Sequence, residues 1–260
     1  MHHHRVERLA AGTSCVHALD PRAKLLACLG FVIAAASLPG WPPSRFAPLL
    51  VLVAAGLAAA RLPWGFVLGR TLLVLPFVGL LVVLLPLTRG QDELWRSPGT
   101  ALIVYREGLE LALAILVKAV LAVLAVGWLV FTTPLYRLLE ALRALRVPAA
   151  VVASLGFLFR YLDLMTDEGL RMRRARQARS PAGPRRLRIR STGSLVGRLL
   201  LRTLERAERI HLAMLARGHD GELRSLEQLA WRRADGLFAL LAFAALGAAA
   251  LLGVWWGGAA

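Results

Sequence analysis

Two matched arginine triplets are the residues of this chain whose types and spacing point most directly to chemistry. Ala178-Arg179-Ser180 and Ala216-Arg217-Gly218 lie thirty-eight residues apart, each where a helical pattern ends. A guanidinium between small neighbours can approach a groove closely and pair with a carboxylate through two parallel hydrogen bonds. An arginine in a last turn followed by a small residue is also an ordinary helix end. Docking onto a partner and helix capping therefore both stay open.

The rest of the chain offers no recognisable catalytic set. It has no Gly-x-x-x-x-Gly-Lys-Ser/Thr phosphate loop, so we expect it not to bind ATP, and it has no zinc-protease or serine-hydrolase motif. His211 and His219 are eight positions apart, but His211 falls on a helical packing stripe. The run His2-His3-His4 is either a metal-binding tract or an inert N-terminus. We predict no metal site, no cofactor and no enzyme activity.

Lys118 is a charged residue in the middle of the apolar run 109–131. A lysine deep in a membrane span faces a protein interior or a cavity and has a partner there. Three explanations of Lys118 stay open: contact with another subunit, contact within the bundle and snorkelling to the interface.

The composition combines an apolar chain with a strong positive charge. Of its 260 residues 57% are hydrophobic, and the formal net charge is +16. This combination is typical of a membrane protein with basic loops on one side. The aromatic residues lie mostly in apolar runs and not among the arginines, so we predict no nucleic-acid partner.

Five apolar runs are long enough, or nearly so, to cross a bilayer. They cover residues 25–38, 46–60, 66–87, 109–131 and 236–256. The third contains Pro76 and Pro86, which a helix bundle tolerates when neighbouring groups bond to the freed carbonyls. The first two runs are short, so one of them could instead be re-entrant.

Basic residues set the orientation of these spans. Between Thr132 and Arg233 there are twenty-one arginines and no lysines, whereas stretches 39–45 and 88–107 contain one and three arginines. The positive-inside rule therefore places residues 134–233 in the cytoplasm and both poorer stretches, read as loops, outside. The apolar run 151–164 is too short to cross, because a membrane helix needs about 20 residues. We predict five spans, with the N-terminus inside and the C-terminus outside.

The cytoplasmic region reads as three helices. Residues 134–147 form a short amphipathic helix, and two longer arginine-rich helices follow on either side of a Pro- and Gly-rich turn at 181–184. The second long helix carries a stripe typical of packing against another helix: Leu200, Leu204, Ala207, His211 and Met214. We expect these two helices to form a hairpin or an X beneath the membrane.

The predicted fold class is an all-α membrane protein with about five transmembrane helices and long cytoplasmic amphipathic helices. Residues 1–133 would form an N-terminal transmembrane region of four spans, and residues 134–233 a cytoplasmic or interfacial region. Residues 234–260 would form the C-terminal transmembrane helix.

With its two arginine triplets, the chain resembles the transmembrane T component of energy-coupling-factor transporters. The stretch from Glu7 to Leu25, with Asp20, Pro21, Arg22 and Lys24, is similar to the CbiQ branch, the cobalt and nickel group. The stretch 213–221 fits the same branch, and the resemblance covers nearly the whole chain.

The resemblance implies a non-catalytic subunit of a bacterial plasma (inner) membrane importer, crossing the membrane several times. In that family the T subunit joins a substrate-binding membrane S subunit to a pair of cytoplasmic ABC ATPases, through coupling helices. By carry-over, Arg179 seats in one ATPase and Arg217 in the other, and the metal ion is bound by the partner subunit. Membrane lipids are a further partner. A T subunit for another micronutrient or vitamin, a membrane enzyme acting on lipid-linked substrates and a basic scaffold on anionic lipid stay as alternatives.

Overall fold

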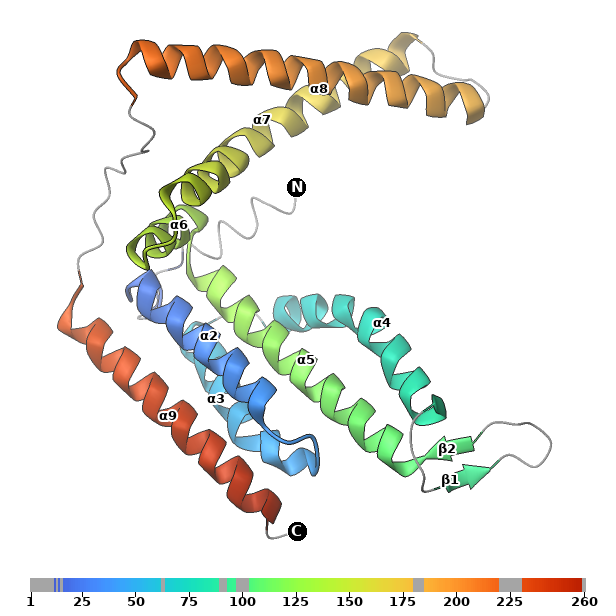
Figure 1. Ribbon diagram of the computed structural model, residues 1–260, viewed down its shortest axis with the longest axis vertical. Helices are drawn as coiled ribbons and strands as arrows, with labels where there is room; N and C mark the ends of the chain where they lie inside the picture. The colour runs from blue at the N-terminus through green and yellow to red at the C-terminus, as the bar shows by residue number, and fades with distance from the viewer. Residues whose placement is uncertain are drawn as a thin grey trace. The chain divides into compact units, whose positions relative to one another are not determined.

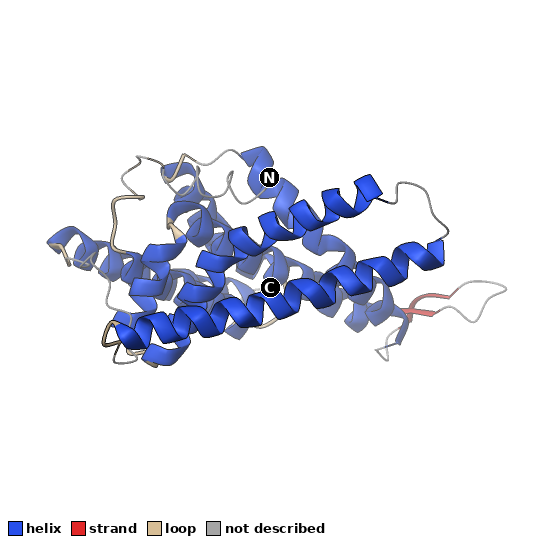
Figure 2. Ribbon diagram, turned by 90° about the horizontal axis from the view of Figure 1, so that it is seen from above, coloured by secondary structure: helices blue, strands red, loops and turns tan. Residues whose placement is uncertain are grey.

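Helices account for almost all of the chain that the structure describes (Figures 1 and 2). This computed structural model describes residues 12, 14, 16–61, 64–88, 93–96, 103–179, 185–219 and 231–258. Its elements in chain order are α2 (Pro21–Ser37), the 3-10 helix η1 (Pro43–Phe46), α3 (Ala47–Ala59), α4 (Trp64–Thr88), β1 (Glu93–Arg96), β2 (Ile103–Tyr105), α5 (Arg106–Thr132), α6 (Leu135–Ala144), α7 (Ala149–Arg179), α8 (Arg185–Ala216) and α9 (Arg233–Gly258).

The chain divides into two compact units. The first contains residues 1–141 and 229–260, and the second is the insertion of residues 142–228 between them. The first unit thus includes α2 to α5 and α9, and the second includes α7 and α8. The membrane boundaries expected at residues 133 and 234 stay a prediction.

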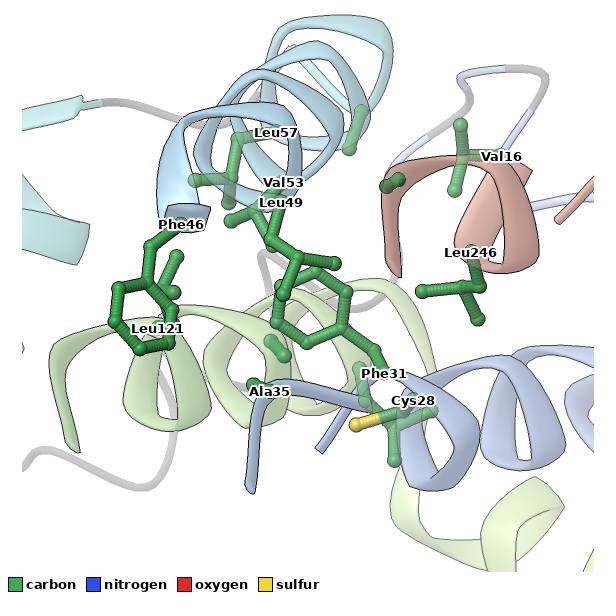
Figure 3. Packing of buried hydrophobic residues seen from close by; sticks show 14 of the residues in the cluster. Val16, Cys28, Phe31, Ala35, Phe46, Leu49, Val53, Leu57, Leu121 and Leu246 are labelled. Atoms are coloured by element: carbon green, nitrogen blue, oxygen red, sulfur yellow. The ribbon is translucent and has the colours of Figure 1, made fainter. Parts of the chain in front are cut away.

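The core of the first unit lies where α2, η1, α3, α5 and α9 meet. Figure 3 shows Phe31 of α2, Leu49 of α3 and Leu121 of α5 among the side chains that pack together there. Trp128 of α5 adds a polar link, because its indole Nε1 donates to the carbonyl oxygen of Gly56 on α3 at 3.1 Å. Apolar packing with few polar links is what holds a bundle together inside a membrane.

Large apolar side chains on the outside of the first unit point to a lipid environment. Phe77 and Leu80 on α4 are 82% and 72% exposed, and Leu251 on α9 is 73% exposed. A soluble protein would bury such residues, since a large exposed apolar surface marks a partner or a membrane. α4 also changes direction along its length (Figure 1) and contains Pro76, whose ring removes a helix hydrogen bond.

Three helices in the described residues are long and apolar enough to cross a membrane. They are α5, residues Arg106–Thr132, the first twenty residues of α9, Arg233–Leu252, and α7, Ala149–Arg179. Two shorter apolar helical segments, Pro43–Ala59 and Pro76–Thr88, overlap the second and third expected spans. The inclusion of α7 differs from the expectation for residues 151–164, because this run continues without a break into the arginine-rich helix and gains length from it.

The stretch 88–107, expected as a loop, contains a β-hairpin. Strands β1 and β2 pair antiparallel, with Glu93 opposite Tyr105 and Arg96 opposite Ile103. The loop was predicted from the polar residues of this stretch. Its aromatic and β-branched residues, however, favour extended backbone. α5 begins directly after β2, at Arg106.

The second unit is a crossed pair of long helices. α7 and α8 cross in Figure 1, which selects the X from the two arrangements expected for this pair. A Cβ atom placed on Gly169 of α7 would lie 3.6 Å from Cδ2 of Leu199 on α8, so the Leu199 side chain packs over the α7 backbone there. The Arg176 guanidinium donates to the hydroxyls of Ser191 and Thr192, and Arg202 pairs with Glu168. Arginines and a small residue therefore hold the crossing.

The stripe of α8 that faces α7 differs from the one predicted. Leu200 and Leu204 are 58% and 54% exposed, and Ala207 and His211 are exposed as well. The half-buried residues of α8 follow a neighbouring stripe: Ser191, Leu195, Leu199, Thr203, Arg206, Ile210 and Met214. Polar contacts of Ser191 and Arg202 with α7 help to set the rotation of α8, and apolar periodicity could not reveal them. Only Met214 of the predicted stripe is half-buried.

Candidate functional site: two arginine tips and a polar junction

The second arginine triplet forms a well-defined helix end. Gly218 has a φ of +76°, a left-handed conformation that glycine adopts without strain. Its N–H donates to the Leu215 carbonyl at 2.9 Å, and the N–H of His219 donates to the Met214 carbonyl at 3.0 Å. These two bonds are a Schellman cap. Capping thus explains Gly218, and it fixes Arg217 as the residue at the tip of α8.

The first triplet marks the end of α7. Ala178 and Arg179 are exposed, and Arg179 is the last residue of the helix. Ser180 lies outside the described residues, as do the expected turn at 181–184 and the run His2-His3-His4. A cation in the last turn is favoured by the helix dipole, which accounts for a positive charge there but does not require arginine.

Four arginines of the crossed pair differ in their surroundings. Arg176 and Arg202 are engaged between α7 and α8, whereas Arg179 and Arg217 are exposed at helix ends. Within the described part of the chain, neither Arg179 nor Arg217 forms an ion pair.

The two tips are too far apart to enter one pocket. From Arg185 to Arg217 helical rise covers about 48 Å. Arg179 and Arg185 are six residue steps apart, and six steps extend over at most about 21 Å. The two arginine Cα atoms are then at least roughly 25 Å apart. The two arginines consequently lie at two separate places on the crossed pair.

A groove of 460 Å³ lies between the first half of α7 and the second half of α8. Tyr161, Arg206, His211 and His219 are among the residues that line it. Across the residues that the structure describes, no group of three His, Cys, Asp or Glu side chains could hold a metal ion. The groove is largely apolar and offers no metal-ligand set.

The N-terminal residues Asp20 to Lys24 start helix α2. The carboxylate of Asp20 accepts from the N–H of Arg22 at 2.8 Å, and Pro21 occupies the first helical position. Both are favoured at a helix N-terminus, since the carboxylate satisfies a free N–H and proline has none to lose. Lys24 is 1% exposed, and its Nζ donates to the carbonyl oxygen of Thr132 at 3.0 Å.

Asp235 completes this arrangement, and sequence analysis missed it. Its Oδ1 accepts from the N–H of Asp20 at 2.8 Å, and its Oδ2 accepts from the N–H of Arg232 at 2.8 Å. Asp235 is 2% exposed. An acidic residue at the third position of α9, bonding back to the residue before the helix, is half of a capping box. This spacing was visible in the sequence, but the contact with Asp20 was not.

We call Asp20, Lys24, Thr132 and Asp235 the polar junction. It joins the N-termini of α2 and α9 to the C-terminus of α5, all within the first unit. Carboxylates lie at the two N-termini and an ammonium lies at the C-terminus, which is the arrangement that helix dipoles favour.

Lys118, on α5, has partners inside the bundle. Its Nζ donates to the Ala36 carbonyl oxygen at 2.8 Å and lies 5.9 Å from the centre of the Phe46 ring. The geometry supports the internal explanation. A contact of Lys118 with another subunit stays a prediction.

Apolar helices around an apolar core, with apolar side chains outside, define a membrane protein with several membrane helices. Residues 12–229 match the family described as CbiQ, cobalt transport protein. The chain belongs to this family and is a transmembrane (T) component of an energy-coupling-factor transporter. Such components are non-catalytic transporter subunits, so the prediction that the chain is not an enzyme is confirmed.

Relatives from both branches of the family cover most of the chain. It is 31% identical over 203 residues to cobalt transport protein CbiQ of Rhodobacter capsulatus, which covers 78% of this chain and 80% of the relative. It is 28% identical over 237 residues to energy-coupling factor transporter transmembrane protein EcfT of Limosilactobacillus fermentum, covering 86% and 88%. The EcfT protein of Acidaminococcus fermentans is 29% identical over 247 residues, covering 90% of each chain. Membership implies association with ABC ATPases and a substrate-binding S subunit.

Proposed function

We propose that this chain couples ATP hydrolysis to the import of cobalt or nickel ions across a bacterial plasma (inner) membrane. It spans that membrane five times, with residues 134–233 on the cytoplasmic side. Arg179 seats in one ATPase subunit and Arg217 in the other. The metal ion is bound by the S subunit, and this chain transmits motion between the two partners.

The observation that carries this proposal is the pair of exposed arginine tips at separate ends of a crossed helix pair. A pair of ATPase subunits presents two equivalent grooves, and the tips are too far apart to share one. Each guanidinium can form a bidentate pair with a carboxylate inside a groove, where two parallel bonds fix its orientation. The two helices contact each other at the crossing of Gly169 and Leu199. A movement of one ATPase subunit therefore displaces both arginine tips.

Exposed leucines on α8 supply an apolar surface beside these tips. Leu200, Leu201 and Leu204 are more than half exposed in an otherwise arginine-rich helix. Such residues suit contact with lipid or with a membrane subunit. This surface supports the view that α8 lies against an apolar partner while its end contacts an ATPase.

The cobalt assignment is supported by the family description and by the name of the Rhodobacter capsulatus relative. The similarity to EcfT proteins supports a second candidate function, that of a T component for another micronutrient or vitamin. Uptake of cobalt(II), nickel(II) and vitamins by proteoliposomes with the complete complex separates these candidates.

Co-purification with the ATPases tests the coupling role. We expect Arg179→Ala and Arg217→Ala each to weaken ATPase association, and the double variant to abolish it while the chain still inserts and folds. Arg171→Ala and Arg209→Ala are matched controls, since both residues are exposed and each lies eight positions before its tip. Normal assembly and transport by the double variant would remove the coupling assignment.

A further inference from the structure

The polar junction lies within the first unit, at the end of the last long helix before the inserted unit and at the start of the first helix after it. The second unit is inserted between residues 141 and 229, so it has two covalent connections to the first unit. One connection leads from α5, which ends at Thr132, through α6, and the other precedes α9, which begins at Arg233. The junction contains a residue from each of these helix ends.

Lys24 holds the connection after α5. Its Nζ bonds to the carbonyl oxygen of Thr132, the last residue of that helix, and both residues are almost fully buried. A buried ammonium that loses its partner is strongly unfavourable, because water cannot replace the lost bond. The end of α5 therefore stays fixed to α2.

Asp235 holds the connection before α9. One of its oxygens bonds to Arg232, the residue that precedes the helix, and the other bonds to the N–H of Asp20. Because both oxygens are used, the start of α9 and the N-terminus of α2 cannot separate without exposing a buried carboxylate. The start of α9 therefore also stays fixed to α2.

Both connections are thus attached to the same short piece of α2. Asp20 and Lys24 are four residues apart, which is about one helical turn. Two connections held at one turn of one helix cannot move independently. A displacement of the second unit then reaches the bundle as a displacement of α2, and α2 packs into the core through Phe31 and Ala35.

We propose that Asp20, Lys24 and Asp235 are positioning residues for energy coupling, which make the membrane bundle follow the movement of the inserted unit. This inference rests on the proposed coupling function, because it concerns the route by which motion enters the bundle. Hydrogen-bond networks and rigid helices are the physical elements through which such coupling travels.

Two variants remove one side of the junction each. Lys24→Met keeps the length of the side chain but removes the donor to Thr132. Asp235→Asn keeps one carbonyl oxygen and so can accept only part of what the carboxylate accepts. Trp128→Phe is the control, because it removes a half-buried bond of similar length, 3.1 Å, between α5 and α3 without touching either connection.

The decisive measurement is cobalt(II) uptake per ATP hydrolysed, in proteoliposomes containing the complete complex. We expect both junction variants to assemble with the ATPases and to hydrolyse ATP, while uptake per ATP falls roughly fivefold or more. The control should keep the wild-type ratio. A wild-type ratio in both junction variants would overturn the proposal, as would an equal loss in the control.

Hydrogen exchange on the isolated chain keeps this inference separate from the proposed function. We expect Lys24→Met to speed exchange around residues 132–134 and Asp235→Asn to speed it around residues 231–235, with no change in the control. If neither region changes, the junction does not hold the connections and the inference is wrong. The variants could also exchange faster while the wild-type chain fails to bind the ATPases. That result would overturn the coupling function and its proposed route.

Discussion

Lys118 on α5 donates a 2.8 Å hydrogen bond from its Nζ to the carbonyl oxygen of Ala36, near the end of α2. Lys24 makes the reciprocal bond, from the start of α2 to Thr132 at the end of α5. The helices run antiparallel, so each supplies an ammonium to the C-terminal carbonyls of the other. Those carbonyls have no partner within their own helix, and a membrane offers no water to replace one.

Replacing Lys118 by methionine should destabilise the bundle. Lys118→Met leaves the Ala36 carbonyl without its donor and removes a favourable charge from the end of α2. We expect a loss of about 1–3 kcal/mol in the free energy of unfolding, as for an acceptor that loses a charged donor where no water can replace it. Denaturant unfolding of the purified protein in detergent measures it.

The same variant tests the predicted subunit contact of Lys118. If the lysine serves only the bundle, the amount of S subunit that co-purifies with Lys118→Met will equal that of the wild type. A loss of the S subunit from a chain that remains folded would instead show that Lys118 also reaches a partner.

Gly218 should be intolerant of a side chain because of its backbone conformation. At a φ of +76°, alanine costs about 1–2 kcal/mol. We expect Gly218→Ala to loosen the tip of α8 and to weaken ATPase association, measured by titration of the ATPases onto the immobilised chain.

Gly197→Ala is the matched control for that substitution. Gly197 lies inside α8, and nothing lies within 4 Å of the position of its added Cβ. Alanine there should stabilise the helix by about 0.5–1 kcal/mol and leave ATPase association unchanged. Equal effects of both alanines would show that the cap at Gly218 has no special role.

Arginine-to-lysine changes separate docking from lipid attraction. Lysine keeps the charge of Arg179 and Arg217 but cannot form the planar bidentate pair. We therefore expect both lysine variants to bind anionic vesicles as the wild type does, and to lose at least tenfold in ATPase affinity, about 1.4 kcal/mol. Unchanged affinity would show that charge alone is recognised.

The membrane placement of α7 can be decided by labelling. By length and composition α7 could cross a bilayer, but the arginines on both sides of residues 151–164 predict that it does not. In a chain without its own cysteines, Ser154→Cys and Ser194→Cys should react with an impermeant maleimide only from the cytoplasmic side.

Gln91→Cys provides the opposite control for that experiment, since residues 88–107 are predicted to lie outside. It should react only from the external side. Labelling of residue 154 from outside would establish α7 as a span and change the predicted count of five.

Local features of the sequence determined the helices and their ends. Apolar runs predicted the membrane helices, Asp20 and Pro21 are favoured at a helix start, and Gly218 was predicted to end α8. These predictions depend on neighbours within a few residues, whose effect on the backbone is intrinsic to their side chains. The charge asymmetry likewise predicted an orientation without any knowledge of packing.

Only the tertiary structure decided which distant residues meet. Asp20 and Asp235 are 215 residues apart, and no periodic pattern links them. The face of α8 that packs on α7 was predicted only in part, because leucine spacing was used while hydroxyls and ion pairs hold the crossing. The sequence by itself thus predicted most of the helices and the helix end at Gly218. The polar junction and the crossing depended on long-range contacts, which form only when several helices pack at once.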